Sequence, residues 1–176
     1  MTEETVSQPG RRRGLNIGLF VLALLLACGC VFGGVLVVQE HRDRDRAAVE
    51  QERYGDVLAS ARTEVEALIN IDYRNAKESI DAVGAGATGD FAKQYDSSTD
   101  SVLEVLRRNK SVMDGKVLWA GVVDQDADSA TVIAATTGTV ANVSTKNKPV
   151  ARSFRVKLDL VNEDGTWKTQ NLEFVG

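Results

Sequence analysis

Residues 154–160 read Phe-Arg-Val-Lys-Leu-Asp-Leu, a strict alternation of apolar and charged side chains. Successive side chains of a β-strand point to opposite faces of its sheet, so this stretch can bury one face and expose the other. The alternation predicts a half-buried strand, and therefore a sheet with one face in the core.

Three further strands are predicted beside this one. Val117–Asp124 and Ala130–Val143 are rich in valine, threonine and isoleucine, and the residues between them, Gln125–Ser129, suit a hairpin loop. Asp164-Gly165 is a tight-turn signal before a last strand at Thr166–Val175. Together these segments predict four antiparallel strands in chain order.

The last strand has an inconsistency in its pattern. Strict alternation places Trp167 and Leu172 on opposite faces. We expect either a β-bulge between them or a Trp167 that covers the other side of the sheet.

Before the sheet, the apolar period is helical. Apolar side chains recur at steps of three and four along a long first helix, which predicts an amphipathic stripe. The stripe comprises Tyr54, Leu58, Ala61, Val65 and Leu68, widened by Val57 and Ile69. The same spacing is a heptad seam, but it is short and includes an alanine, so packing within the domain is favoured over a partner helix.

The polar segment Asn70–Asn75 interrupts this helix. A second helix is predicted from Asn75, with Glu78 completing a capping box, and Gly84–Gly86 ends it. Thr88–Asp90 predicts the start of a third helix.

Helices followed by strands indicate an α+β fold. We expect a cone-like domain at residues 47–176, with about three helices packed on a curved four-stranded antiparallel sheet. A charged juxtamembrane linker, residues 39–46, precedes it, and residues 1–14 are expected to be a disordered cytoplasmic tail.

The uncharged, apolar stretch at residues 15–38 predicts a transmembrane helix. At 1.5 Å per residue it would extend about 36 Å, enough to cross a hydrocarbon core of about 30 Å. Arg11, Arg12 and Arg13 precede it, whereas mixed charges follow it, which favours a cytoplasmic N-terminus. We therefore expect a single-pass protein of the cell membrane with an extracytoplasmic C-terminal domain.

Two features of this stretch allow further interpretations. Leu25-Leu26-Ala27-Cys28 resembles a lipobox, so lipidation at Cys28 is the alternative to an uncleaved anchor, although apolar residues continue for another ten positions. Gly29 and Gly33 form a GxxxG pattern, which lets a second membrane helix pack closely; glycine is also simply common in such helices.

Composition excludes several chemistries. The net charge of −4 argues against nucleic-acid partners. The only histidine is His41, and both cysteines lie in the apolar stretch, so we expect no disulfide in the domain, no metal site and no catalytic triad. Asp124, Asp126 and Asp128 resemble the start of a calcium loop, but Ser129 stands where glycine is needed, so they are interpreted as a hairpin tip.

A family resemblance rests on short motifs spread along the domain. Asp72-Tyr73, Thr88-Gly89-Asp90-Phe91 and Asp164-Gly165-Thr166-Trp167 resemble the small Mce-associated membrane proteins of actinobacteria, named for mammalian-cell-entry transport systems. The resemblance implies a cone similar to nuclear transport factor two and to bridging subunits of type IV secretion machines. It also implies a non-catalytic accessory subunit of an Mce-type lipid or sterol transporter in the cell envelope.

We therefore expect no enzyme activity and no cofactor. The expected partners are the membrane, other Mce transport components and a second copy of the chain. One alternative is a small apolar ligand carrier or isomerase-like enzyme, because cones of this type include isomerases that use a tyrosine and buried acids. The candidate pocket residues are Tyr54, Tyr73, Tyr95 and Trp167. The other alternative is a bridging subunit of a secretion machine.

Overall fold

The computed structural model describes residue 44 and residues 46–176. It divides into two units, Met1–Glu50 and Gln51–Gly176, and the second holds the folded domain considered below. Gly29 and Gly33, the predicted span at residues 15–38 and the cytoplasmic tail lie outside the described residues. Within the described part of the chain, no helix is both long and apolar enough to cross a bilayer.

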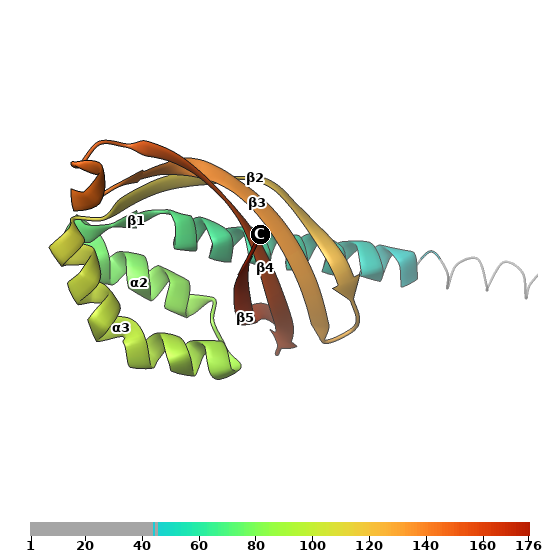
Figure 1. Ribbon diagram of the computed structural model, residues 1–176. Coiled ribbons are helices and arrows are strands. Elements are labelled where there is room, and N and C mark those ends of the chain that lie inside the picture. The colour runs from blue at the N-terminus through green and yellow to red at the C-terminus, as the bar shows by residue number, and fades with distance from the viewer. Residues whose placement is uncertain (1–43, 45) are drawn as a thin grey trace, which may run out of the picture. The chain divides into compact units, whose positions relative to one another are not determined.

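The sheet of the second unit is antiparallel throughout and has the order β1-β2-β3-β4-β5 (Figure 1). The four predicted strands are present; the first and third are longer than predicted, the second ends two residues earlier, and the last has the predicted bounds. They are β2 (Val112–Gln125), β3 (Ser129–Ala141), β4 (Val150–Glu163) and β5 (Thr166–Val175).

A short fifth strand, β1 (Ile71–Asp72), corrects the predicted count of four. It pairs with Val112 and Met113 of β2, at the point where the chain leaves the first helix. Its two residues lie inside the polar segment interpreted as a turn, and two residues are too few for an alternating pattern to reveal a strand.

A β-bulge settles the inconsistency in the last strand. Thr169 pairs with Leu160 and Asn171 with the adjacent Asp159, so Gln170 is the extra residue. The bulge resets the alternation, so that Trp167 is buried and Leu172 packs against the same core. The first of the two predicted explanations is therefore confirmed.

The three predicted helices are also present. The first runs over residues 46–69, followed by η1 (Tyr73–Asn75), α2 (Ala76–Ala85) and α3 (Gly89–Asn109). A further short helix, η2 (Val143–Thr145), joins β3 to β4. The predicted strand Ala130–Val143 thus ends at Ala141, because the Asn142 side chain accepts hydrogen bonds from the Ser144 and Thr145 amides and turns the backbone into a helix.

The predicted capping box at the start of α2 is wrong. Asn75 is the N-cap, but its side chain makes no capping hydrogen bond. The cap lies one turn earlier, where the Asp72 carboxylate accepts from the Arg74 amide and begins η1. Since η1 leads directly into α2, the helical start is already secured before Asn75 is reached.

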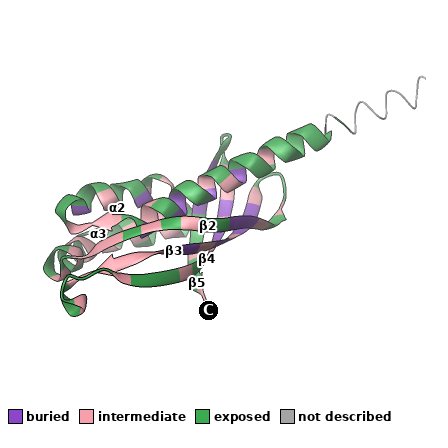
Figure 2. Cartoon of the chain, turned by 90° about the horizontal axis from the view of Figure 1, so that it is seen from above, coloured by how far each residue is buried: buried purple, intermediate pink, exposed green. Residues whose placement is uncertain are grey.

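The core lies between the first helix and the concave face of the sheet (Figures 1 and 2). The buried helix residues are Val57, Ala61, Glu64, Val65 and Ile69, and the buried strand residues include Val132, Ala134, Val156, Leu158 and Leu160. The buried stripe is rotated from the predicted one, because Tyr54 is 40% exposed and Leu58 is half-buried. The five residues of this buried stripe include one acid.

Candidate functional site

The acid on the buried stripe, Glu64, is the most unusual side chain of the domain. Only 4% of its surface is exposed. Its Oε1 is the one buried side-chain nitrogen or oxygen without a hydrogen-bond partner among the residues that the structure describes. An unsatisfied buried acceptor costs about 1–3 kcal/mol, so a position that retains one needs an explanation.

Burial changes the acidity of Glu64. Removal from water disfavours the charged form and raises the pKa of the Glu64 carboxyl from 4.5 to about 7. The group can therefore gain or lose a proton near neutral pH. A carboxyl in this state can donate a hydrogen bond when protonated or accept a cation when ionised.

A partly open cavity of about 310 Å³ lies beside Glu64, between the first helix, α2 and β5. Its walls include small residues, Ala59, Ala82, Ala85 and Gly86, together with Trp167 on β5. Ser60, Thr63 and Thr169 add hydroxyl groups to the lining. The Glu64 cavity, as we name it, thus has walls of small apolar and hydroxyl-bearing residues and one carboxyl.

Gly86 gives the carboxylate its room. A Cβ built at this position would lie well inside van der Waals contact of Glu64 Oε2 and 3.1 Å from its Cδ. The backbone around Gly86 is held by its amide donating to Val83 O and its carbonyl accepting from the Thr169 amide at 2.8 Å. This pair of hydrogen bonds fixes the chain between α2 and α3 against β5.

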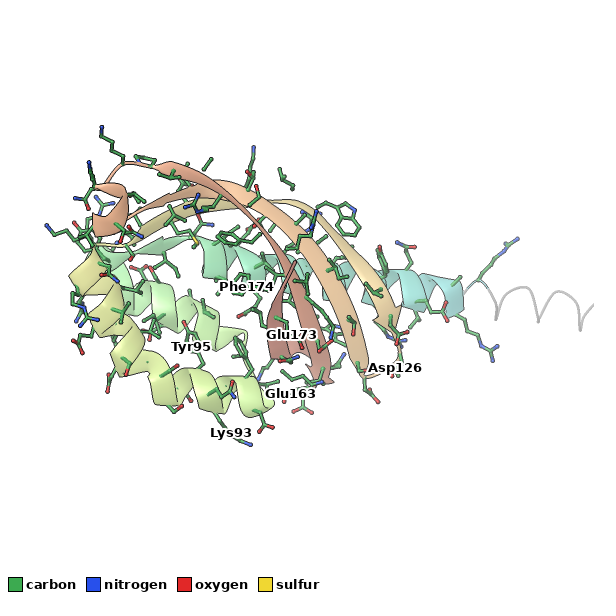
Figure 3. The ribbon with its side chains drawn as sticks, in the orientation of Figure 1. Lys93, Tyr95, Asp126, Glu163, Glu173 and Phe174 are labelled. Carbon is green, nitrogen blue, oxygen red and sulfur yellow. The ribbon has the colours of Figure 1, made fainter. Side chains whose placement is uncertain are left out.

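Tyr95, one of the four candidate pocket residues, lies close to this site. It projects from α3 toward α2 (Figure 3), and its hydroxyl donates to the Ile80 carbonyl at 3.1 Å. Burial, and then the negative charges of Glu64 and Asp81, raise the pKa of the Tyr95 hydroxyl to about 12. Tyr95 is therefore a neutral neighbour of Glu64 at any ordinary pH.

The four candidate pocket residues do not form one cluster. Trp167 lines the Glu64 cavity and Tyr95 lies near it, whereas Tyr54 is on the exposed side of the first helix and Tyr73 is half-buried in η1. Sequence reasoning missed Glu64 itself. The available signal was its spacing, because Glu64 is three residues after Ala61 and seven after Val57, which puts a charge on the apolar stripe.

A second feature is an apolar surface on β2, which we call the β2 surface. It consists of Leu118, Trp119 and Val123, which are 60%, 56% and 62% exposed. β1 covers only Val112 and Met113 of this strand, so within the described residues the rest of β2 forms an edge of the sheet. Register shifts at Val117/Trp119 and Val122/Asp124 make Leu118 and Val123 the bulged residues.

The hairpin between β2 and β3 has the role predicted for its acids. Asp126 lies at the tip (Figure 3), where its carboxylate accepts from the amides of Asp128 and Ser129 and from the Ser129 hydroxyl. These hydrogen bonds hold the pKa of Asp126 below its usual range. In the described part of the chain, no group of three or more histidine, cysteine or acidic side chains could hold a metal ion.

Solved structures share this fold at low sequence identity. An IcmL-like type IV secretion system protein of Legionella pneumophila has a TM-score of 0.55 and 13% identity, over 69% of this chain and 91% of that chain. The periplasmic domain of DotI has a TM-score of 0.56 and 12% identity, over 68% and 92%. A ketosteroid isomerase-like protein of Erwinia carotovora atroseptica has a TM-score of 0.54 and 21% identity, over 71% of this chain and 98% of that chain. These similarities confirm the fold, with helices packed on a curved antiparallel sheet.

Sequence comparison finds a mycobacterial relative. The uncharacterized protein Rv1363c of Mycobacterium tuberculosis is 29% identical over 182 residues, which cover 98% of this chain and 67% of the relative. A family profile described as uncharacterized protein Rv1363c/MT1408-like matches residues 16–176. The chain belongs to this Rv1363c/MT1408-like family.

Proposed function

We propose that this chain is a non-catalytic accessory subunit of the cell envelope, which acts by binding other proteins through the β2 surface. Residues 15–38 would anchor it in the membrane, with the cone outside the cytoplasm. The observation that carries the proposal is the exposure of three large apolar side chains on an edge strand, because exposed apolar surface of this kind marks protein–protein interaction sites.

The geometry of the β2 surface suits a protein partner. Trp119 lies against Gly121, where an added Cβ would be 2.8 Å from the indole Cη2, so the ring covers the backbone at this glycine. Exposed tryptophans are frequent anchors of protein interfaces. The two bulges turn the strand away from regular pairing, which favours docking of side chains over extension of the sheet.

The partner we propose is a component of an Mce-type lipid or sterol transporter. The support is the resemblance of the motifs around Asp72, Thr88 and Asp164 to Mce-associated membrane proteins. The fold also fits a second candidate, a subunit of a secretion machine, because solved structures of type IV secretion proteins share the cone. A fold alone does not select between these roles.

Photo-crosslinking in the native membrane tests the proposal. Benzoylphenylalanine at position 119 should crosslink to Mce transport proteins, identified by mass spectrometry. The same residue at position 105 on α3 is the matched control, because Val105 is also an exposed apolar residue but lies outside the β2 surface. Crosslinks from position 119 to secretion-machine components would favour the second candidate. A crosslinking pattern equal to that from position 105 would overturn both.

A further inference from the structure

We propose that the Glu64 cavity binds a small organic ammonium ion, with its nitrogen at the Glu64 carboxylate and its hydrocarbon part against Trp167. This inference goes beyond the proposed function and does not depend on it, because the cavity and the β2 surface share no residue.

The first step is the unmet hydrogen-bonding capacity of the site. Glu64 Oε1 is buried and has no donor. Hydroxyl groups line the cavity, but the Thr63 hydroxyl donates to the Ala59 carbonyl at 3.0 Å, within its own helix. A ligand that carries hydrogen-bond donors would therefore satisfy an acceptor that the folded chain leaves open.

The second step is charge, which selects a cation over a neutral donor. Within the described residues the cavity lining includes no lysine, arginine or histidine, so the carboxylate has no positive counterpart there. Tyr95 on α3 lies within reach of the charges of Glu64 and of Asp81 on α2, and neither Tyr95 nor Asp81 supplies positive charge. A buried carboxylate is stabilised most by a cation that also donates hydrogen bonds, and a protonated amine does both.

The third step is the shape and polarity of the walls. About 310 Å³ is enough for a short hydrocarbon chain beside the charged group, and Ala59, Ala82, Ala85 and Gly86 make part of the walls small and apolar. The indole of Trp167 adds a flat apolar surface, which attracts ammonium groups through its π-electrons as well as alkyl chains. A carboxylate beside an indole is therefore chemically matched to an alkylammonium ion.

Fluorescence of Trp167 offers a direct test. The chain has two tryptophans, so Trp119→Phe leaves Trp167 as the only indole, at the cavity wall. The full chain, in a non-ionic detergent, is titrated with n-pentylammonium chloride and separately with 1-pentanol, its neutral analogue. We expect a saturable change in Trp167 fluorescence with pentylammonium, and at least tenfold weaker binding of pentanol.

Variants and pH identify the group that binds. Glu64→Gln should weaken pentylammonium binding at least tenfold, whereas Glu66→Gln, an exposed acid on the same helix, should leave it unchanged. Because Glu64 must ionise while the amine stays charged, affinity should rise about tenfold between pH 6 and pH 8. Tyr95 stays protonated over this range, so the change reports Glu64.

Several outcomes would overturn the inference. Equal binding of pentanol and pentylammonium would make the cavity a neutral apolar pocket, and linear fluorescence change without saturation would mean no site at all. If Glu64→Gln does not fold, calorimetry of the Trp119→Phe chain in two buffers of different ionisation enthalpy replaces it. Proton release on pentylammonium binding at pH 6 is then required, and its absence counts against Glu64 as the anion.

Discussion

The Glu64 carboxylate lies directly against the α-carbon of Gly86, where any side chain would collide with Oε2. The two residues come from different helical segments, since Glu64 is in the first helix and Gly86 ends α2. Gly86 has φ −90° and ψ −3°, a conformation that any residue can adopt. Glycine is therefore needed here for lack of space and not for its backbone conformation, because the Glu64 carboxyl occupies the volume that a Cβ would fill.

Gly86→Ala should destabilise the chain by about 1–3 kcal/mol, because its Cβ displaces the Glu64 carboxylate from its position. The measurement is urea unfolding of the single variants Gly86→Ala and Glu64→Ala and of the double variant. If the collision is the cause, Gly86→Ala should cost much less in the Glu64→Ala background. Additive effects of the two changes would show that Gly86 is constrained by something other than Glu64.

Glu64→Gln should make stability less dependent on pH. The pKa of Glu64 is raised from 4.5 to about 7 in the fold, so its protonated form is the one that the native state favours. Its stabilising contribution is therefore full below pH 4.5 and is lost as pH rises through 7, about 3 kcal/mol in total. The glutamine variant lacks this loss and should gain stability relative to the native chain at pH 8.

Urea unfolding at pH 5 and pH 8 measures that difference. Other shifted acids, such as Asp159, have lowered pKa values and act at lower pH, so the comparison isolates Glu64. The exposed Glu66→Gln is the control and should show the pH dependence of the native chain. The same dependence in Glu64→Gln would mean that Glu64 does not titrate in the fold.

The strands were predictable because apolar and polar side chains alternate along them, and this alternation requires only that one face of the sheet is buried. The alternation at 154–160 and the Trp167–Leu172 mismatch gave both the strand and the bulge. The position of the helix cap was harder to predict, because the choice between Asp72 and Asn75 depends on where η1 forms. It also depends on the pairing of β1 with β2, in which Asp72 pairs with Val112, 40 residues later in the sequence.

The site was less predictable than the fold. An amphipathic pattern identifies which side of a helix is buried. A glutamate in that pattern is assigned to the exposed side, so Glu64 marks an edge of the predicted apolar stripe and not a member of it. Its burial depends on Gly86 and on β5, which come from distant parts of the sequence. Tyr54 shows the reverse error, because an aromatic residue at helical spacing is 40% exposed and lies outside the buried stripe.

Gly138→Ala should be far more damaging than Gly115→Ala, although the two glycines face each other across β2 and β3. A Cβ at 138 would fall inside contact distance of the Asp114 carbonyl oxygen and 2.6 Å from the Gly115 Cα, both backbone atoms. The atoms nearest to a Cβ at 115 belong to the Ile69 side chain, the first at 3.0 Å. We expect a loss of about 3 kcal/mol at 138 and about 1 kcal/mol at 115.

Thermal and urea unfolding provide these values. Gly55→Ala is the matched control, because nothing lies within 4 Å of its Cβ and it is in an exposed helical position. Alanine should stabilise that position by up to about 1 kcal/mol. Similar losses at 115 and 138 would contradict the close approach of the two strands.

Asn70→Ala should destabilise the edge of the sheet more than Asn75→Ala, although sequence alone assigns the capping role to Asn75. The Asn70 amide donates to the Gly115 carbonyl and accepts from the Gly115 amide, both at 3.0 Å, and so pairs with β2 just beyond β1. The same side chain also donates to the Glu66 carbonyl at 2.9 Å. Losing these three hydrogen bonds should cost about 1–3 kcal/mol. The Asn75 side chain makes no capping bond, so its removal should change stability by less than about 0.5 kcal/mol. Hydrogen exchange of the Gly115 amide should accelerate in Asn70→Ala alone, and equal exchange in the two variants would mean that Asn70 does not protect this edge.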